Sequence, residues 1–202
     1  MADKRDVQIS KSLSYLLRHG AEKEKLAIDP QGWIALDVLL NHHRLKSQKA
    51  SVTDIERIVA QNDKQRFSLK SVDDSVYICA NQGHTLKAVT PELELLTSET
   101  MPANVYHGTF RRKLPAIEQT GLSRMQRNHI HFTSDAEWSK LGIRPNCDVL
   151  IYIDTSRLLD NGYELYRSRN GVILCGGNAD GVIPAYYFSR IVTRDSDGGD
   201  QC

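Results

Sequence analysis

The stretch "RFSLKSVDDSVYICA", residues 66–80, decides the fold of the first part of the chain. Its two ends, "RFSLK" and "VYICA", alternate in the manner of β-strands that bury one face. The polar segment "SVDDS" between them favours a tight turn. The stretch therefore predicts a two-stranded β-hairpin.

A helical pattern opens the chain well before this hairpin. Apolar residues recur at helical spacing over residues 7–17, and the following "RHG" predicts a helix that ends at Arg18 and His19, with Gly20 as a left-handed C-cap. Two interpretations of the Arg18–His19 pair are open. In the first, the pair stabilises the helix C-terminus, where the helix dipole favours cations. In the second, the pair takes part in a chemical reaction.

Two further helices are expected between this helix and the hairpin. One covers residues 34–43, after the turn "DPQGW". The other covers "SVTDIERIVAQND", residues 51–63, where either Ser51 or Thr53 can serve as the N-cap. Three short helices followed by a β-ribbon predict a winged-helix lobe.

The composition changes over residues 90–104, "TPELELLTSETMPAN", where prolines and glutamates gather. We place a domain boundary there, with one lobe over 1–97 and a second over 98–202. Short β-branched and aromatic strands with helices between them predict an α+β second lobe. The segment from about residue 195 is expected to be a disordered tail. The expected elements of this lobe are the strands "VYHGT", "HIHFTS", "DVLIYID", "GVILCGG" and "IVTRD" and helices over 114–119 and 135–141.

The overall composition is that of a globular protein. The 202 residues have a net charge of +1, so a surface that attracts nucleic acid must be local. The four cysteines show no CxxC spacing, which indicates reduced thiols rather than a zinc site or a disulfide framework. No stretch is typical of a leader or a membrane helix. We therefore expect a protein of the cytoplasm, the nucleus or both, with no contact with membranes. We also expect a monomer.

Histidines are concentrated in short polar patches. Five of the seven lie in "RHG", "QGHT", "YHGT" and "NHIHFTS". His129 and His131 are two residues apart on an expected strand, so their side chains share one face and a metal pair is an alternative. The chain has no HExxH spacing, and acidic residues do not alternate with the histidines, so we expect no metal.

Arginines are the candidates for binding phosphate. The chain has neither GxxxxGK[ST] nor GxGxxG, so guanidinium groups must hold a phosphate, and Arg18, Arg66 and Arg127 adjoin the histidine patches. For each of them taken alone, a solvated surface position is the alternative. Basic residues also recur in the first lobe, as an RNA-binding surface or as charges spread around a small domain. They are Arg44, Lys46, Lys49, Arg57, Lys64 and Arg66.

Seven segments in one order resemble those of a known enzyme family. They are "LSYLLRHG", "IDPQGW", "NDKQRF", "ICANQGHT", "YHGT", "RNHIHFTS" and "NGVIL", and over residues 6–192 the chain resembles the tRNA 2′-phosphotransferases. The resemblance implies a winged-helix RNA-binding lobe followed by an ADP-ribosyltransferase-like lobe, with the active site in the cleft between them.

The same resemblance implies an enzyme of tRNA splicing that uses NAD as co-substrate and no metal. The splice-junction 2′-phosphate of ligated tRNA is transferred to NAD through RNA-2′-phospho-ADP-ribose. The products are 2′-OH RNA, ADP-ribose 1″,2″-cyclic phosphate and nicotinamide.

The resemblance also implies the site residues. Arg18, His19, Arg66 and Arg127 form the catalytic set. Arg66 and Arg127 serve mainly the phosphate and the second step, Arg18 binds either the 2′-phosphate or the NAD pyrophosphate, and His19 either accepts the proton of the ribose 2″-hydroxyl or orients that hydroxyl. The residues implied to bind NAD are Gly83, His84, His107, Gly108, Thr109, His131, Thr133 and Ser134.

Three features depart from the family or its relatives. Cys79 stands where many members have arginine, and Thr85 stands where many have serine. The segment "NGVILCGG" lacks the glutamate that many ADP-ribosyltransferases have, which argues against protein ADP-ribosylation. Two other functions stay open: a non-catalytic RNA-binding module, and an ADP-ribosyltransferase that caps 5′-phosphorylated nucleic-acid ends.

Overall fold

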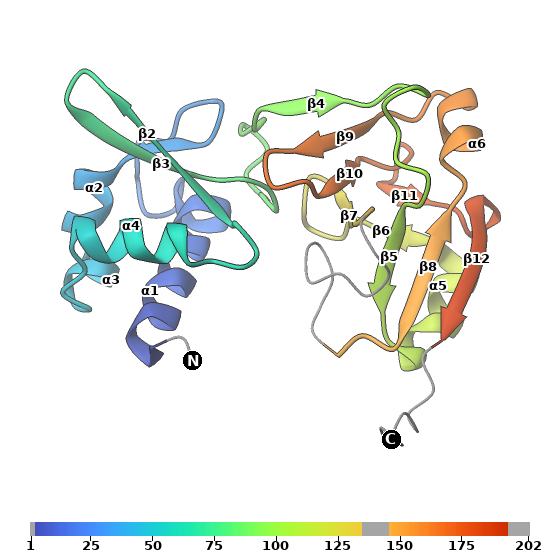
Figure 1. Ribbon diagram of the computed structural model, residues 1–202, viewed down its shortest axis with the longest axis horizontal. Coiled ribbons are helices and arrows are strands. Elements are labelled where there is room, and N and C mark those ends of the chain that lie inside the picture. Colours follow the sequence, from blue (N-terminus) through green and yellow to red (C-terminus); the bar gives the residue numbers. More distant parts are fainter. Residues whose placement is uncertain (1–2, 135–145, 194–202) are drawn as a thin grey trace, which may run out of the picture. The chain divides into compact units, whose positions relative to one another are not determined.

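A computed structural model describes residues 3–134 and 146–193, and it divides the chain into two compact units, Met1–Glu92 and Leu93–Cys202 (Figure 1). The helix expected over 135–141 and the tail expected from about residue 195 lie outside the described residues. None of the described helices is long and apolar enough to cross a membrane.

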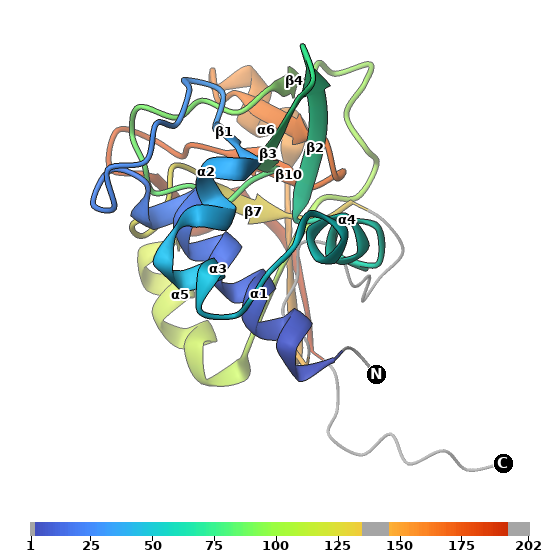
Figure 2. The ribbon, with the colours of Figure 1, turned by 90° about the vertical axis from the view of Figure 1, so that its left-hand side faces the viewer.

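The first unit combines short helices with a three-stranded antiparallel sheet, in the strand order β1-β3-β2. Helix α1 packs against both α3 and α4 (Figure 2). The elements are α1 (Lys4–Tyr15), a π-helical turn (Leu16–Gly20), β1 (Trp33–Ala35), α2 (Leu36–Asn41), α3 (His43–Lys46), α4 (Val52–Ala60), β2 (Phe67–Val72) and β3 (Ser75–Ala80).

The predicted hairpin is confirmed as β2 and β3, which pair from Phe67 opposite Ala80 to Val72 opposite Ser75. Asp73 and Asp74 form the two-residue turn, and both have positive φ values, 46° and 62°. Two residues with positive φ match the right-handed twist of the paired strands, and aspartate accepts this conformation better than most residues.

The helix predicted over 51–63 is confirmed as α4. Ser51 is its N-cap, and a capping box joins the Ser51 side chain to the backbone of Asp54 and the Asp54 side chain to the backbone of Ser51.

The single helix predicted over 34–43 is wrong in part. Trp33 and Ile34 belong to β1, where they pair with Cys79 and Ile78 of the hairpin. The helical residues that follow are split, because His42 has an extended ψ of 139° between α2 and α3. Pairing with a distant strand therefore overrides the local helical pattern.

Apolar side chains fill one core in the first unit. From α1 and the π-helical turn, one face contributes residues with no exposed surface, and the sheet contributes Ile34 and Ile78. The buried residues of the helix recur at regular helical spacing, which explains why the sequence predicts this helix. The fully buried residues of that face are Ile9, Leu13, Leu16 and Leu17.

The second unit contains two antiparallel sheets, β4-β9-β10-β7 and β12-β8-β5, and a two-stranded pair, β11-β6. The helix predicted over 114–119 is confirmed as α5. The elements are β4 (Leu93–Leu95), β5 (Tyr106–Thr109), α5 (Leu114–Thr120), β6 (Leu122–Ser123), β7 (Ile130–Phe132), β8 (Val149–Ile153), α6 (Thr155–Asp160), β9 (Leu165–Ser168), β10 (Ile173–Cys175), β11 (Val182–Ile183) and β12 (Phe188–Thr193), with 3-10 turns at Arg111–Lys113 and Ala185–Tyr187.

Side chains of both larger sheets share one apolar cluster, with Phe132 and Ile173 from one sheet and Val149 and Ile151 from the other. Because side chains alternate between the two faces of a strand, the neighbours of these residues along each strand point to the opposite face of the sheet. The protein is therefore of mixed helix and strand composition, as the α+β expectation requires.

Candidate active site

The turn that carries Arg18 and His19 is a π-helix, Leu16–Gly20, that directly continues α1. The expectation of a left-handed C-cap at Gly20 is wrong: Gly20 lies inside this turn, and Ala21 after it is again right-handed, with φ −53° and ψ −47°. Glycine is needed for another reason, because a Cβ atom at position 20 would lie 2.6 Å from the Tyr15 ring. Single π-turns inside helices are often found at functional sites.

The segment after β3 contacts this turn. The backbone N–H of Thr85 donates to the Arg18 carbonyl at 2.9 Å, and the Thr85 hydroxyl lies 3.0 Å from Nδ1 of His19. The Arg18 side chain lies beside Gly83, whose φ is +87°. The structure therefore brings the predicted residues Arg18, His19 and Gly83 together, and His84, next in the chain, is buried.

The Thr85 hydroxyl contacts both the Arg18 backbone and the His19 ring. The Thr85 hydroxyl donates to the Arg18 carbonyl at 3.3 Å. The same hydroxyl lies 3.0 Å from Nδ1 of His19, which donates or accepts according to the tautomer of the ring.

Arg66 lies directly before β2, opposite Asn81, the first residue after β3. Its carbonyl accepts from the Asn81 N–H at 2.9 Å, and its guanidinium donates to the Asn62 side chain at 3.0 Å. The side chain is half-buried, and this burial lowers the pKa of Arg66. A guanidinium nevertheless stays protonated in proteins, so Arg66 is a fixed cation.

Asn81 is a residue that the sequence analysis did not single out. Its buried side chain donates to the Gln65 carbonyl at 2.6 Å and accepts from the Ser68 hydroxyl at 2.7 Å. Asn81 thus holds the start of the segment that reaches Thr85, with Arg66 on one side of it. The signal in the sequence was its place inside "ICANQGHT", between a strand and the polar "QGHT".

In the second unit, the segments "YHGT" and "HIHFTS" lie side by side. The backbones of Tyr106 and Thr133 exchange two hydrogen bonds, at 3.0 and 2.9 Å. Nδ1 of His107 donates to the His131 carbonyl at 2.8 Å, which leaves Nε2 of the neutral His107 ring as an acceptor. The two predicted NAD-binding segments therefore form one local structure.

The other residues of the second unit that are predicted to bind NAD lie on these same two strands or directly after β7. Gly108 pairs with Leu150, and Thr109 ends β5 as a buried residue. His131 and Thr133 are buried as well, and Ser134 is half-buried after the strand. Ring nitrogens, hydroxyl groups and strand backbone are groups that can bind an amide or ribose hydroxyls.

Arg127 is exposed in the loop between β6 and β7. Arg124 holds this loop: its carbonyl accepts from the Arg127 N–H at 3.1 Å, and its guanidinium donates to the Arg127 carbonyl at 3.0 Å. Arg124 was not singled out from the sequence either. Its own N–H donates to the carbonyl of Gly181, which links the loop to the region of β11.

His129 and His131, which were considered as a metal pair, have different surroundings. His131 is buried on β7, whereas the His129 ring stands edge-on to Tyr166, with 6.3 Å between ring centroids. Burial, with a smaller contribution from Arg124, lowers the pKa of His129. Within residues 3–134 and 146–193, no third His, Cys, Asp or Glu ligand atom joins them.

Two of the basic residues proposed for RNA binding are held by acidic partners in the first unit. Arg57 forms ion pairs with Asp6 and Asp54, at 2.8 and 2.9 Å. Arg44 lies 3.6 Å from Glu24. Lys46 and Lys49 are exposed, so the lysines are better placed than these arginines to meet a phosphate backbone.

The cysteines are buried wherever the structure describes them. Cys79 pairs within the sheet with Trp33 and Ser68, and its side chain is buried. Cys147 and Cys175 are also buried.

Arginine and histidine side chains beside polar backbone turns are typical of proteins that bind phosphate-bearing ligands. The chain belongs to the RNA 2′-phosphotransferase, Tpt1 / KptA family, which it matches over residues 4–177. It is 45% identical to the Bos taurus tRNA 2′-phosphotransferase 1 over 192 residues, covering 92% of this chain and 75% of the relative.

Relatives from other kingdoms show similar identity. The Saccharomyces cerevisiae tRNA 2′-phosphotransferase is 42% identical over 202 residues, covering 95% of this chain and 86% of the relative. The probable RNA 2′-phosphotransferase of Trichormus variabilis is 38% identical over 188 residues, covering 92% of this chain and 97% of the relative.

Proposed function

We propose that this protein is an NAD-dependent tRNA 2′-phosphotransferase. It transfers the splice-junction 2′-phosphate of ligated tRNA to NAD and yields 2′-OH RNA, ADP-ribose 1″,2″-cyclic phosphate and nicotinamide. The observation that carries the proposal is the contact of Arg18 and His19 with Gly83 and Thr85, in a chain that belongs to the RNA 2′-phosphotransferase family.

The arginines Arg18, Arg66 and Arg127 are proposed to bind the phosphate groups. A guanidinium offers a planar fork of donors that matches phosphate oxygens, and it keeps its charge when half-buried, as Arg66 is. Displacement at phosphorus places extra negative charge on the oxygens, which fixed cations stabilise. We assign Arg66 and Arg127 to this step, and Arg18 to the 2′-phosphate or the NAD pyrophosphate.

His19 is proposed to accept the proton of the ribose 2″-hydroxyl. Its Nδ1 is engaged by Thr85, so Nε2 is proposed as the atom that takes the proton. An unperturbed imidazole has a pKa of about 6.5, close to the pH at which a general base works best. A base of this kind converts the hydroxyl into a nucleophile for the phosphorus.

The second unit is proposed to hold NAD. Bound NAD would supply an electrophilic ribose carbon with nicotinamide as its leaving group. The Nε2 acceptor of His107, the buried hydroxyl groups of Thr109 and Thr133, and the small Gly108 suit a carboxamide and ribose hydroxyls. His131, Ser134, Gly83 and His84 complete the proposed NAD-binding set.

The proposal assigns a lobe type and a role to each unit. The helices and three-stranded sheet of Met1–Glu92 support a winged-helix RNA-binding lobe, with Lys46 and Lys49 toward the RNA backbone. The two antiparallel sheets of the second unit support an ADP-ribosyltransferase-like lobe. Residues of both units, Arg127 with Arg18, His19 and Arg66, are proposed to act on one pair of substrates.

Product analysis tests the proposed reaction. A synthetic RNA with one internal 2′-phosphate is incubated with the protein and NAD in the presence of EDTA, and the products are identified by mass spectrometry. We expect nicotinamide, ADP-ribose 1″,2″-cyclic phosphate and 2′-OH RNA in equal amounts. A strict need for a divalent metal would overturn the metal-independent mechanism.

The same experiment separates the alternative functions. An enzyme that caps 5′-phosphorylated ends would yield ADP-ribose joined to the RNA 5′ end and no cyclic phosphate. A binding module would consume no NAD and would bind RNA with a steep salt dependence. Either result would contradict the proposed function.

The buried thiols Cys79, Cys147 and Cys175 support a reducing compartment, the cytoplasm or the nucleus.

A further inference from the structure

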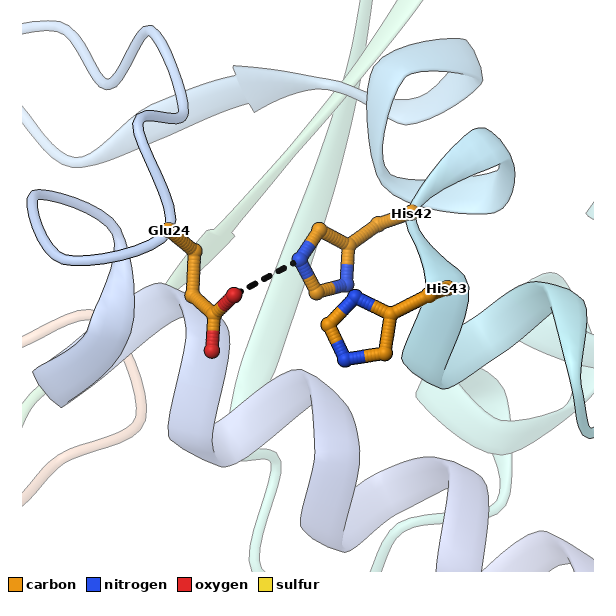
Figure 3. Close-up of side chains that lie close together, drawn as sticks. All are labelled: Glu24, His42 and His43. Atoms are coloured by element: carbon orange, nitrogen blue, oxygen red, sulfur yellow. Dashed lines mark hydrogen bonds and ion pairs between the residues drawn. The ribbon is translucent and has the colours of Figure 1, made fainter.

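A cluster outside the proposed active site joins Glu24, His42 and His43 of the first unit (Figure 3). Glu24 lies in the turn that follows the π-helix, His42 separates α2 from α3, and His43 begins α3. One ligand atom from each of the three side chains lies within 4.8 Å of the other two.

The three side chains are already arranged by contacts with one another. Nε2 of His42 and Oε2 of Glu24 are 3.2 Å apart, and the ring centroids of His42 and His43 are 4.3 Å apart. The side chains of His42 and Glu24 are only 9% and 18% exposed, whereas His43 is exposed. The cluster is therefore shielded on one side and open to solvent on the other.

The two carboxylate oxygens of Glu24 have separate surroundings. Oε1 accepts from the Tyr15 hydroxyl at 3.4 Å and lies 3.6 Å from Nε of Arg44, while Oε2 faces His42. Burial raises the pKa of Glu24, but the hydrogen bond with His42 and the charges of His42, Arg44 and His43 outweigh it, so the pKa is lowered. Outer contacts of this kind orient a carboxylate as a metal ligand.

We propose that Glu24, His42 and His43 bind one divalent ion of the zinc type, with water as the fourth ligand. Two imidazoles and one carboxylate are a known zinc ligand combination, and imidazole favours zinc and its neighbours over magnesium or calcium. Tetrahedral zinc places its N and O ligands about 3.3 Å apart, so the 4.8 Å cluster must contract. Rotation of the exposed His43 ring supplies this movement.

Metal binding at Nε2 of His42 changes the protonation of that ring. Nδ1 of His42 accepts from the Arg44 N–H at 3.4 Å, so Nε2 carries the proton in the neutral ring. The ion displaces this proton to Nδ1, at the expense of a long and therefore weak hydrogen bond.

This site is separate from the proposed reaction, which requires no metal. None of the three residues belongs to the proposed catalytic or NAD-binding set. Tyr15, which contacts both Glu24 and Gly20, links the cluster to the π-helical turn. The expected effect of the ion is therefore to stabilise the first unit rather than to take part in phosphate transfer.

Zinc titration of the full-length, tag-free protein tests the proposal. The protein is treated with EDTA, exchanged into metal-free buffer and titrated with ZnCl2 in a calorimeter, with MgCl2 as the comparison ion. We expect one zinc ion per chain and no saturable magnesium binding.

Variants locate the ion. Because His43 is exposed, His43→Asn should fold normally and should weaken zinc affinity at least about tenfold. Glu24→Gln should weaken it similarly, and the matched control His129→Asn should leave it unchanged. Unaltered zinc affinity in His43→Asn, or the absence of stoichiometric binding by the unmodified protein, would overturn the site. Loss of phosphotransfer alone would bear only on the proposed function.

Discussion

At the scale of single residues, Thr85 holds the proposed general base. Its hydroxyl lies 3.3 Å from the Arg18 carbonyl and 3.0 Å from Nδ1 of His19. Thr85→Val keeps the shape but removes both bonds, so the His19 ring loses this hydrogen-bond partner at Nδ1. We expect kcat to fall by about 10²-fold, the lower range for loss of general base catalysis.

The measurement is the pH profile of cyclic phosphate release. Thr85→Ser keeps the hydroxyl and should restore most of the rate. A Thr85→Val profile with the unmodified midpoint and rate would show that Thr85 does not position His19.

Substitution of Arg66 or Arg127 tests which of the two reaction steps these residues serve. If both stabilise charge at phosphorus, Arg66→Ala or Arg127→Ala should let the first step proceed and should accumulate RNA that carries ADP-ribose at its 2′-phosphate. Gel or mass analysis of the RNA detects this species. Loss of a single fixed donor at such a site costs about 10²–10³-fold in rate.

Arg112→Ala is the control, because Arg112 is exposed on the ring of Phe110. Only unreacted RNA in the Arg66 and Arg127 variants would mean that these residues serve binding or the first step instead.

At the scale of elements, Asp54 joins two helices of the first unit. It belongs to the capping box of α4, and both of its oxygens accept from the Arg5 guanidinium of α1, at 3.0 and 2.8 Å. Hydrogen bonds from Arg5, then from Ser51 and Arg57, outweigh burial and hold the pKa of Asp54 well below its usual value. A lowered pKa in the folded state stabilises the fold when the carboxylate is charged.

Asp54→Asn should therefore lower the free energy of unfolding at pH 7 by about 1–3 kcal/mol, the cost of disrupting a buried, charged hydrogen-bond group. The stabilisation is fully present above about pH 4, the ordinary pKa of aspartate, and is lost as the pH falls from there through the folded-state pKa. Urea unfolding from pH 7 to pH 3 measures it. The exposed Asp63→Asn is the control, and equal pH dependence in both variants would contradict the prediction.

The sequence shows elements whose causes are local. The "SVDDS" turn and the cap of the helix predicted over 51–63 depend on neighbouring residues: the turn is confirmed, and of the two candidate caps, Ser51 and Thr53, the structure has Ser51. Strand β1 was missed because Trp33 and Ile34 form a strand only through pairing with Cys79 and Ile78. The π-turn was missed because hydrophobic spacing does not distinguish one π-turn at the end of a helix from a further α-turn.

The candidate site divides in the same way. Arg18, His19 and Arg66 could be predicted as site residues from the short polar segments around them and from the family resemblance. The hydrogen bond between Thr85 and His19 could not be predicted, because 66 residues separate the two in sequence. Asn81 and Arg124 were also missed, since they act by holding backbone rather than by a recognisable chemistry.

At the scale of the whole molecule, each unit has its own apolar core. The cluster around Leu13 and Ile78 lies within Met1–Glu92, and the cluster around Ile151 and Ile173 lies within the second unit. Composition placed the boundary after residue 97, whereas the compact units divide after Glu92, because β4 already pairs with β9. A strand of three residues leaves too little pattern to be seen in a sequence.

Separate cores predict separate responses to core substitution. Leu13→Ala should lower the stability of the first unit by about 2–5 kcal/mol. Hydrogen exchange followed by mass spectrometry should show faster exchange in α1, β2 and β3 and unchanged exchange in β8 and β10. Ile151→Ala should give the reverse pattern. Equal acceleration throughout the described parts of the chain would show that the two units unfold as one.

The π-helical turn also constrains the gene that encodes this protein. A π-turn holds one residue more than an α-turn, so an in-frame deletion of one codon within Leu16–Gly20 would let the helix continue with ordinary geometry. A deletion before Arg18 would change the positions of Arg18 and His19 relative to α1, and with them their contacts with Gly83 and Thr85. We therefore expect descendants of this gene to preserve the number of residues between Leu13 and Gly20 as strictly as their identity.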